Sequence, residues 1–388
     1  MKRSLLLATF VSLLLTVVVG VHVYLARRLI FDLELPANLR GGLLVGLIGL
    51  AATLVVQPIA QRQWGRAATQ LVSWPAALWM GFAFLLLVTL TGSDLLWWMA
   101  ARTALADVSG VQSATVAARM RAFSVVGFSL VVGLTAVRLA LRPPAVRRVE
   151  LRLARWPRAL DGYRIVQISD VHIGPLLGRR FAADIVARCR TLRPNLLAVT
   201  GDLVDGSVAQ LADEVAPFAA LHAPDGVFFV TGNHDYFSGA RAWVEAVQGL
   251  GWRVLRNERV VIEANGAAFE LAGVDDHQGG ALVGELGEDL PTALTGRTPS
   301  RPLVLLAHDP ATFQQASQMG IDLQLSGHTH GGQIWPFRYL VRLYTPFVAG
   351  VHERNGAQLY VSCGTGFWGP PMRLFAPAEI TELVLRAA

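Results

Sequence analysis

Residues 227–236, VFFVTGNHDY, decide the fold class of the C-terminal part of this chain. A short apolar run rich in Val and Phe is typical of a buried β-strand. The run is followed by a glycine and three polar side chains, Asn233, His234 and Asp235. The same plan occurs at 196–202, LLAVTGD, which also ends in glycine and a carboxylate. Repeated apolar strands with polar ends are typical of an α/β sheet whose strand ends hold a functional site.

Three more strand-like segments end in polar residues in the same way. Asp170 and His172 follow RIVQIS, His308 follows LVLLA, and His328 and His330 lie in GHTHGG after LQLS. Five of the nine histidines of the chain are therefore at predicted strand ends. Because the carboxyl ends of neighbouring strands in an α/β sheet gather ligands, we expect these side chains to lie close together.

The region around these motifs alternates strand-like and helix-like segments, which predicts an α/β domain with buried sheets. We predict strands at 164–169, 196–200, 227–231, 269–273, 303–307, 323–326 and 358–362, and helices at 179–190 and 209–221.

The N-terminal part of the chain has a different composition. Overall, 53% of residues are hydrophobic and only 16% are charged, against about 25% charged in ordinary soluble domains. That composition excludes a disordered chain and disfavours an entirely soluble one. Four uncharged stretches approach the length needed to cross a hydrocarbon core of about 30 Å. We predict spans at 4–25, 41–56, 71–91 and 123–137. The second and fourth are short, so three spans remain the alternative.

We divide the chain into three regions. Residues 1–142 form a transmembrane region of about four helices, with 94–121 as an interfacial connection. Residues 143–160 form a basic juxtamembrane linker that begins at two prolines, and 161–388 form the α/β domain. Lys2 is the single lysine, and this replacement of Lys by Arg indicates genome composition rather than a nucleic-acid surface. No nucleic-acid partner is therefore expected.

The distribution of basic residues predicts an orientation in the membrane. With four spans, both chain ends lie on one side, and the flanks on that side carry ten Arg and Lys against six opposite. Cytoplasmic flanks carry the excess of basic residues. We therefore expect a multi-pass protein of the cell inner membrane, with membrane lipids around it and its C-terminal domain in the cytoplasm. An error of one span would reverse the side.

The residue types at the strand ends suit metal binding. Imidazole and carboxylate groups bind Zn, Mn and Fe, and the absence of thiolates at these strand ends argues against a structural Cys-rich zinc site. Asp170 and His172 could turn toward one ion, and so could His328 and His330. Asp202 could bridge two ions, because a carboxylate has about four lone-pair sites. Two cations about 3.5–4 Å apart would hold a phosphate and activate a water.

The motif order D-x-H, G-D, G-N-H-D, H and G-H-T-H resembles the calcineurin-like metallophosphoesterase superfamily over residues 163–385. The GHTHGGQ form, the segment YVSCGTGFWGPPMR at 360–373 and the multispan N-terminus further resemble the membrane-associated bacterial branch related to the YkuE and YaeI phosphodiesterases. Cys363 departs from that branch, where a more polar residue is expected. The resemblance implies a four-layer αββα sandwich.

The resemblance also implies a site with two divalent metal ions, which could be Mn²⁺, Fe²⁺/Fe³⁺ or Zn²⁺. It assigns Asp170, His172 and His330 to the first metal, Asn233, His308 and His328 to the second, and Asp202 to both. It implies that His234 faces the scissile phosphate and assists the leaving group. Asp235 would then orient His234.

Five other residues were open to two interpretations. Asp205 either supports the loop of Asp202 or is a solvated loop acid. Arg373 either contacts a substrate anion or makes a structural pair, and His277 is either at the pocket rim or in a plain loop. Tyr344 and Trp368 either form an apolar rim for a lipid or pack in the core.

These expectations define a function. We predict a membrane-anchored, dinuclear metal-dependent phosphoesterase that hydrolyses phosphodiester or pyrophosphate bonds. Its phosphoester substrate could be lipid-linked, such as a UDP-diacylglucosamine-like intermediate. The alternative is a non-catalytic membrane sensor or scaffold whose phosphoesterase-like domain binds a ligand without turnover. A transporter is disfavoured, because the predicted spans lack acidic or basic residues at mid-membrane.

Overall fold

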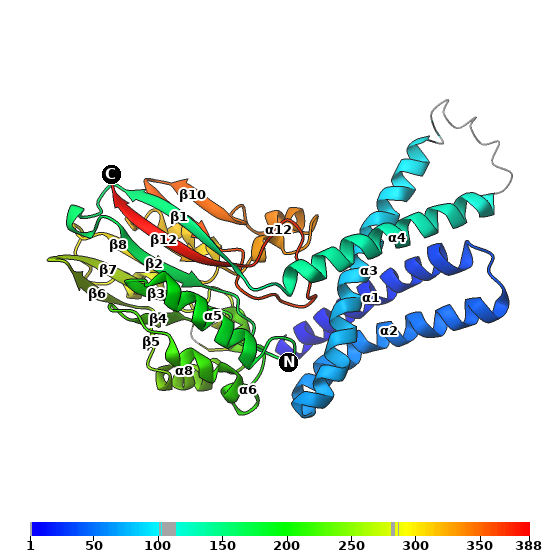
Figure 1. The fold of residues 1–388 in the computed structure, drawn as a ribbon, viewed down its shortest axis with the longest axis horizontal. Helices are drawn as coiled ribbons and strands as arrows, with labels where there is room; N and C mark the ends of the chain where they lie inside the picture. The colour runs from blue at the N-terminus through cyan, green and yellow to red at the C-terminus, as the bar shows by residue number, and fades with distance from the viewer. Residues whose placement is uncertain (1, 101, 103–113, 281–283, 286) are drawn as a thin grey trace. The chain divides into compact units, whose positions relative to one another are not determined.

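The computed structural model describes residues 2–100, 102, 114–280, 284–285 and 287–388, and it contains two compact units (Figure 1). The helical unit comprises Met1–Arg138 and Gly369–Pro371. The sheet unit comprises Leu139–Trp368 and Met372–Ala388. The main boundary thus lies a few residues before the end of the predicted transmembrane region at 142.

Four long helices form the helical unit. They are α1 (Lys2–Ala26), which continues into a π-helical turn (Arg27–Phe31), α2 (Ala37–Gln63), α3 (Arg66–Ala100) and α4 (Ala114–Ala140). Each has a segment long and apolar enough to cross a membrane. The 27 residues of α2, for example, extend about 40 Å, which exceeds the ~30 Å hydrocarbon core. All four predicted spans lie inside these helices, and the helices continue beyond them through polar residues.

A cluster of charged side chains joins three helices of the helical unit. Asp94 accepts hydrogen bonds from Tyr24 Oη at 2.7 Å and Arg28 Nε at 2.8 Å, and it also pairs with Arg121. Arg28 pairs in addition with Asp32 at 2.9 Å.

The interfacial connection predicted at 94–121 is therefore wrong at both of its ends. Residues 94–100 complete α3 and 114–121 begin α4, while 101 and 103–113 lie outside the described residues. The helices extend to these charged residues because the charges are paired with one another.

We expect Asp94→Asn to lower the thermal unfolding temperature of the protein in detergent. The substitution leaves Arg28 and Arg121 without their shared carboxylate, at a cost of about 1–3 kcal/mol for a partly buried interhelical cluster. Asp32→Asn is the control, because Asp32 pairs with Arg28 only along one helical segment and should cost less. Equal unfolding temperatures for Asp94→Asn and the parent protein would contradict the role of this cluster.

Two six-stranded mixed sheets form the centre of the sheet unit. The first has the order β1-β12-β2-β3-β4-β5, with β1 at Ala145–Leu153, β2 at Tyr163–Ile168, β3 at Leu196–Thr200, β4 at Val227–Val230, β5 at Arg253–Val254 and β12 at Glu379–Ala387. The second has the order β10-β11-β9-β8-β7-β6, with β6 at Glu258–Ala264, β7 at Ala267–Gly273, β8 at Leu303–Leu306, β9 at Leu323–Ser326, β10 at Gly350–Arg354 and β11 at Ala357–Val361. Strands β2, β3 and β4 are parallel, as are β7, β8 and β9.

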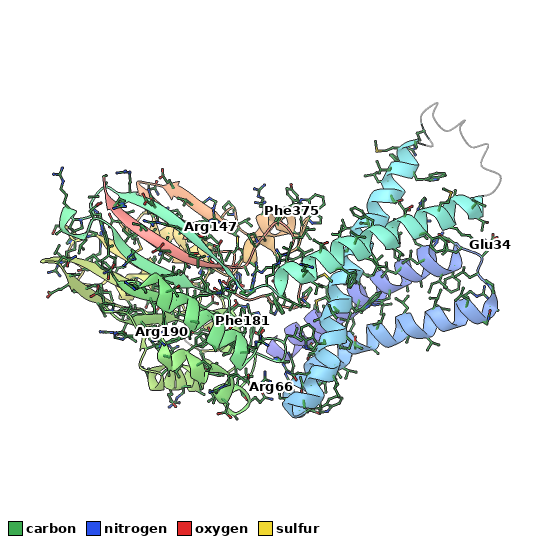
Figure 2. All side chains as sticks on the ribbon, viewed as in Figure 1. Glu34, Arg66, Arg147, Phe181, Arg190 and Phe375 are labelled. Carbon is green, nitrogen blue, oxygen red and sulfur yellow. The ribbon has the colours of Figure 1, made fainter. Side chains whose placement is uncertain are left out.

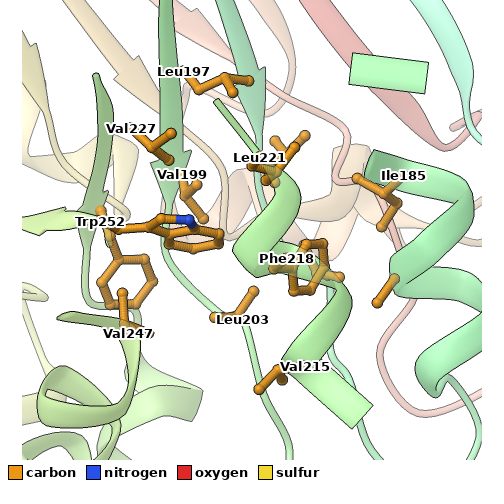
Figure 3. Packing of buried hydrophobic residues seen from close by; sticks show 14 of the residues in the cluster. Ile185, Leu197, Val199, Leu203, Val215, Phe218, Leu221, Val227, Val247 and Trp252 are labelled. Carbon is orange, nitrogen blue, oxygen red and sulfur yellow. The ribbon is translucent and has the colours of Figure 1, made fainter. Parts of the chain in front are cut away.

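Alternate side chains of the strands enter different cores, as expected for strands buried on both faces. In β3, Leu197 and Val199 face a core shared with helices α5 (Arg179–Leu192), α6 (Val208–Val215) and α8 (Ala240–Gly249), which Figure 3 shows. Leu196 and Ala198 face the core between the two sheets. The outer face of the second sheet packs with α10 (Leu290–Leu294) and α11 (Phe313–Ala316). The unit is therefore the four-layer αββα sandwich that the resemblance implied.

Residues 143–160 do not form the predicted linker. Half of this segment is β1, which pairs in parallel with β12, and Trp156 and Leu160 are buried in the core between the sheets. The basic residues misled the prediction, because they alternate with Val149, Leu151 and Leu153, which point toward that core. Arg147 lies on this edge strand (Figure 2).

Candidate metal centre

The seven predicted metal ligands lie at the carboxyl ends of parallel strands from both sheets. Strands β2, β3 and β4 supply residues from the first sheet, and β8 and β9 supply residues from the second. In chain order these residues are Asp170, His172, Asp202, Asn233, His308, His328 and His330. Asn233 is also the first residue of α7 (Asn233–Phe237).

Asp170, His172 and His330 form the first donor set. One ligand atom from each lies within 4.8 Å of the others, and all three residues are buried. His330 Nε2 is 3.0 Å from His172 Nε2 and 3.5 Å from Asp170 Oδ1. Asp202 Oδ2 lies 3.8 Å from His172 Nε2, so the carboxylate of Asp202 borders this set.

Asp202, His308 and His328 form the second donor set, and Asn233 adjoins it. Asp202 Oδ2 is 3.2 Å from His308 Nε2. His328 Nδ1 is 3.2 Å from His308 Nε2 and 3.1 Å from Asn233 Oδ1. The same oxygen, Asp202 Oδ2, therefore faces both sets, which is the arrangement that a bridging ligand requires.

Hydrogen bonds to the far ring nitrogens orient two of the imidazoles. His308 Nδ1 donates to the Thr200 carbonyl at 2.8 Å, and His172 Nδ1 donates to Asp205 Oδ1 at 3.2 Å. Both acceptors require the proton on Nδ1, so each Nε2 presents a lone pair to the centre. Such outer partners are typical of metal-binding histidines.

The backbone at the ligands is unusual. Five of the seven have positive φ, between 49° and 70°, a region that non-glycine residues seldom occupy: Asp170, His172, Asp202, His328 and His330. Glycines allow the strand ends to approach the ligands. A Cβ at Gly232 would overlap the Asp202 carboxylate, and one at Gly327 would overlap Ser169 Oγ and Asp170 Oδ2. Strained residues held in this way cluster at functional sites.

The charges and donor atoms fit a pair of cations. Asp170 Oδ2 is buried and accepts no hydrogen bond from the described residues. Burial opposes ionisation of Asp202, but His308 and His234 outweigh it and hold the pKa of this carboxyl well below its usual range. Burial and the neighbouring His172 lower the pKa of His330, which favours the neutral imidazole that metals bind. The pocket thus offers N and O donors and favours positive charge at Asp202.

His234 lies beside both donor sets. Its backbone N–H donates to Asp202 Oδ1 at 2.8 Å, and its Nδ1 is 2.7 Å from Asp205 Oδ1. Nε2 is therefore the ring nitrogen that a substrate could reach. Burial lowers the pKa of His234, but Asp202 and Asp205 outweigh it and raise that pKa to about 9. Asp205 thus holds both His172 and His234.

The role predicted for Asp235 is wrong. Its carboxylate accepts hydrogen bonds from the backbone N–H groups of Asp202, Leu203 and Gly232, at 2.8–3.0 Å, and so ties the end of β4 to the Asp202 loop. Asp205 orients His234 instead. The signal was present in the sequence, because Asp205 follows Asp202 by three residues, but a loop acid at that spacing is also common.

The chain has relatives among known proteins. A family model described as calcineurin-like phosphoesterase matches residues 163–332. An uncharacterized metallophosphoesterase of Aquifex aeolicus is 33% identical over 244 residues, which are 62% of this chain and 91% of the relative. The chain belongs to the calcineurin-like phosphoesterase family.

Other relatives include proteins that are named as transmembrane proteins. A bovine transmembrane protein with metallophosphoesterase domain is 42% identical over 261 residues, covering 64% of this chain. This chain spans only 59% of the length of that relative. The uncharacterized metallophosphoesterase YkuE of Bacillus subtilis is 29% identical over 258 residues, which are 64% of this chain and 88% of the relative.

The structure also places the other four residues that are open to two interpretations. Arg373 is buried and donates to the carbonyls of Cys363 and Ala376, so it makes structural contacts. His277 is partly exposed and pairs with Glu288. The rings of Tyr344 and Trp368 are both half exposed, at 6.1 Å from His328 and 5.5 Å from His234 respectively, and therefore lie at the rim of the centre.

We expect Gly327→Ala to reduce metal-dependent phosphoester hydrolysis about 10²-fold. The added methyl overlaps Asp170 Oδ2, and displacing a ligand by about 1 Å costs that much in a positioned site. Gly249→Ala is the control, because its Cβ meets no atom within 4 Å and lies at the end of a helix. Metal content and turnover are measured on both variants, and equal values for them would contradict the close approach.

Proposed function

We propose that this protein is a membrane-anchored, two-metal phosphoester hydrolase that cleaves phosphodiester or pyrophosphate bonds. One observation carries the proposal: two sets of buried N and O donors meet at Asp202 Oδ2. When bound, two cations would neutralise phosphoryl oxygens and make a water nucleophilic near neutral pH.

The residues of the chain supply two donor sets that share the Asp202 carboxylate. Asp170, His172 and His330 would hold the first cation, and Asn233, His308 and His328 the second, with Asp202 shared. Their backbone follows directly on strand ends, and the amide contacts of Asp235 hold Asp202 and Gly232. The site is therefore preorganised for an anionic phosphoryl group.

His234 and Asp205 supply the group that assists the leaving oxygen. Asp205 accepts from His234 Nδ1 and leaves Nε2 directed away from that contact. An imidazolium held in this way can donate a proton from Nε2 to the departing oxygen. No side-chain nucleophile is needed, since water is the attacking group.

Four apolar helices support a multi-pass anchor. An even number of spans and the excess of basic flanking residues support a catalytic unit in the cytoplasm, at an inner membrane. An enzyme tied to a bilayer meets lipid headgroups at high local concentration. We therefore propose a lipid-linked phosphoester as the substrate, such as a nucleotide pyrophosphate of a diacylated sugar.

The test is hydrolysis of bis(p-nitrophenyl) phosphate by the full chain in nanodiscs, with Mn²⁺, after chelation, and after Mn²⁺ is restored. We expect release of p-nitrophenolate that is lost on chelation and recovered with metal. A folded protein that binds two metal equivalents without turning over this diester or a panel of lipid pyrophosphates would favour the scaffold alternative.

A further inference from the structure

The helix that follows the GHTHGG motif has its apolar residues on the outside. Helix α12 (Arg338–Tyr344, RYLVRLY) has no buried residue. Its Tyr339, Leu340, Leu343 and Tyr344 are all exposed, Leu343 at 84%. These positions are three and four residues apart and therefore lie on one face. That face points away from the protein.

Helix α5 shows the ordinary arrangement in the same unit. Its Ile185, Val186 and Cys189 are buried in the core, while Asp184 and Ala187 on the other face are exposed. A surface helix of a globular protein normally turns its apolar stripe inward in this way. Helix α12 has the opposite orientation, with its apolar side chains exposed to solvent.

Two aromatic residues outside the helix extend its exposed face. Trp335 precedes α12, and its backbone N–H donates to the Leu374 carbonyl at 3.2 Å. This contact brings Phe375 next to Trp335, with ring centroids 6.4 Å apart. Phe375 is 77% exposed and lies on the surface of the unit (Figure 2). We call Trp335, Tyr339, Leu340, Leu343 and Phe375 the aromatic surface.

The polar residues of α12 are basic. Arg338 and Arg342 are one turn apart, and the Arg342 guanidinium lies 5.8 Å from the Tyr339 ring centroid. The helix carries no acidic residue. Leu, Trp and Phe on one side with Arg beside them are typical of helices that lie in a membrane interface and contact anionic lipids. Exposed Trp and Tyr are also preferred at that depth.

The chain keeps the start of the sheet unit near a bilayer if α4 spans one. Residues 141–144 alone separate the end of α4 from the start of β1, and five residue steps reach about 18 Å at most. The sheet unit therefore has no long linker by which it could leave the membrane surface.

We propose that the aromatic surface inserts into the interfacial layer of a bilayer that contains anionic lipids. A protein partner or second copy would also cover apolar residues, but the basic residues and the short connection to α4 favour lipid. The proposal deepens the proposed function, and its consequence for substrate access to the metal centre rests on that function. Tyr344 at the end of α12 donates to Asp309 at 2.6 Å and lies beside His328, so a headgroup at this surface would be next to the metal centre.

The test measures membrane depth and does not depend on turnover. The full chain carries a nitroxide at Leu343→Cys. The matched control carries it at Ala187→Cys, on the exposed face of α5. Both proteins are reconstituted in nanodiscs with or without anionic lipid. The two native cysteines are buried and should stay unlabelled. We expect the ratio of O₂ to nickel-chelate accessibility to be several-fold higher at 343 than at 187, and higher with anionic lipid.

Equal ratios at the two positions would overturn the proposal. A label at 343 that is shielded from both O₂ and the nickel chelate would also overturn the proposal. Dipolar broadening that disappears on dilution with unlabelled protein would then show that a second copy of the chain covers this surface. Diester turnover is measured on the same samples. Lipid exposure at 343 without metal-dependent turnover would support membrane insertion of the aromatic surface and contradict the proposed function. Metal-dependent turnover without lipid exposure at 343 would support the proposed function and contradict membrane insertion.

Discussion

Asp202→Asn is expected to reduce kcat/KM for bis(p-nitrophenyl) phosphate by at least about 10³-fold, with less than two metal ions bound per chain. Asp202 Oδ1 accepts from the His234 backbone, so the carbonyl of Asn would take that position. The amide NH₂ would then replace Oδ2, the atom that faces both donor sets, and an NH₂ group binds no cation. Loss of several kcal/mol of charge stabilisation corresponds to this effect.

Asp184→Asn is the matched control, because Asp184 is an exposed aspartate on α5. It removes the same charge from the same unit and should leave activity and metal content at parental values. Turnover is measured against metal concentration, and metal content by elemental analysis. An Asp202→Asn protein that binds two ions and retains a tenth of parental activity would exclude Asp202 as the bridge.

His234→Ala is expected to slow hydrolysis of alkyl phosphodiesters by about 10²–10⁴-fold while metal content is unchanged. The imidazole borders the donor sets and is held through Nδ1 by Asp205, so its loss removes a proton donor rather than a ligand. The loss should be smaller for a p-nitrophenyl ester, because p-nitrophenolate departs without needing a proton. The measurement is kcat for a series of diesters whose leaving groups differ in basicity.

Asp205→Asn separates positioning from proton donation. It keeps an oxygen near His172 and His234 but removes the charge, so we expect a smaller loss than for His234→Ala, with a shifted pH profile and full metal content. If His234→Ala lowered the rates of all esters equally, or lost a metal ion, His234 would be a ligand or a structural residue instead.

The strand ends and the polar side chains that stand on them were predictable from local sequence. Strands β3 and β9 have the predicted bounds, and the other five predicted strands overlap observed ones. An apolar run of four to six residues followed by glycine and a metal-binding side chain contains its own structural signal, because strand burial and turn geometry are local properties. The four apolar helices were predictable for the same reason.

The pairings between distant segments were not predictable in this way. Strand β1 was mistaken for a linker, since its partner β12 begins at Glu379, more than 200 residues later in the chain. His234 donates its orienting hydrogen bond to Asp205 and not to its sequence neighbour Asp235. The loops of His234 and Asp205 meet only when β3 and β4 are paired.

The sequence alone determined seven of the twelve strands that the structure describes, the four apolar helices and the side chains at the strand ends, because these depend on patterns within a few residues. Only the tertiary structure decided that Asp202 Oδ2 faces both donor sets, that Asp235 ties two loops together and that α12 turns its apolar face outward. Those features depend on distances between segments far apart in the chain, and such distances are set by strand pairing within each sheet and by how the two sheets pack.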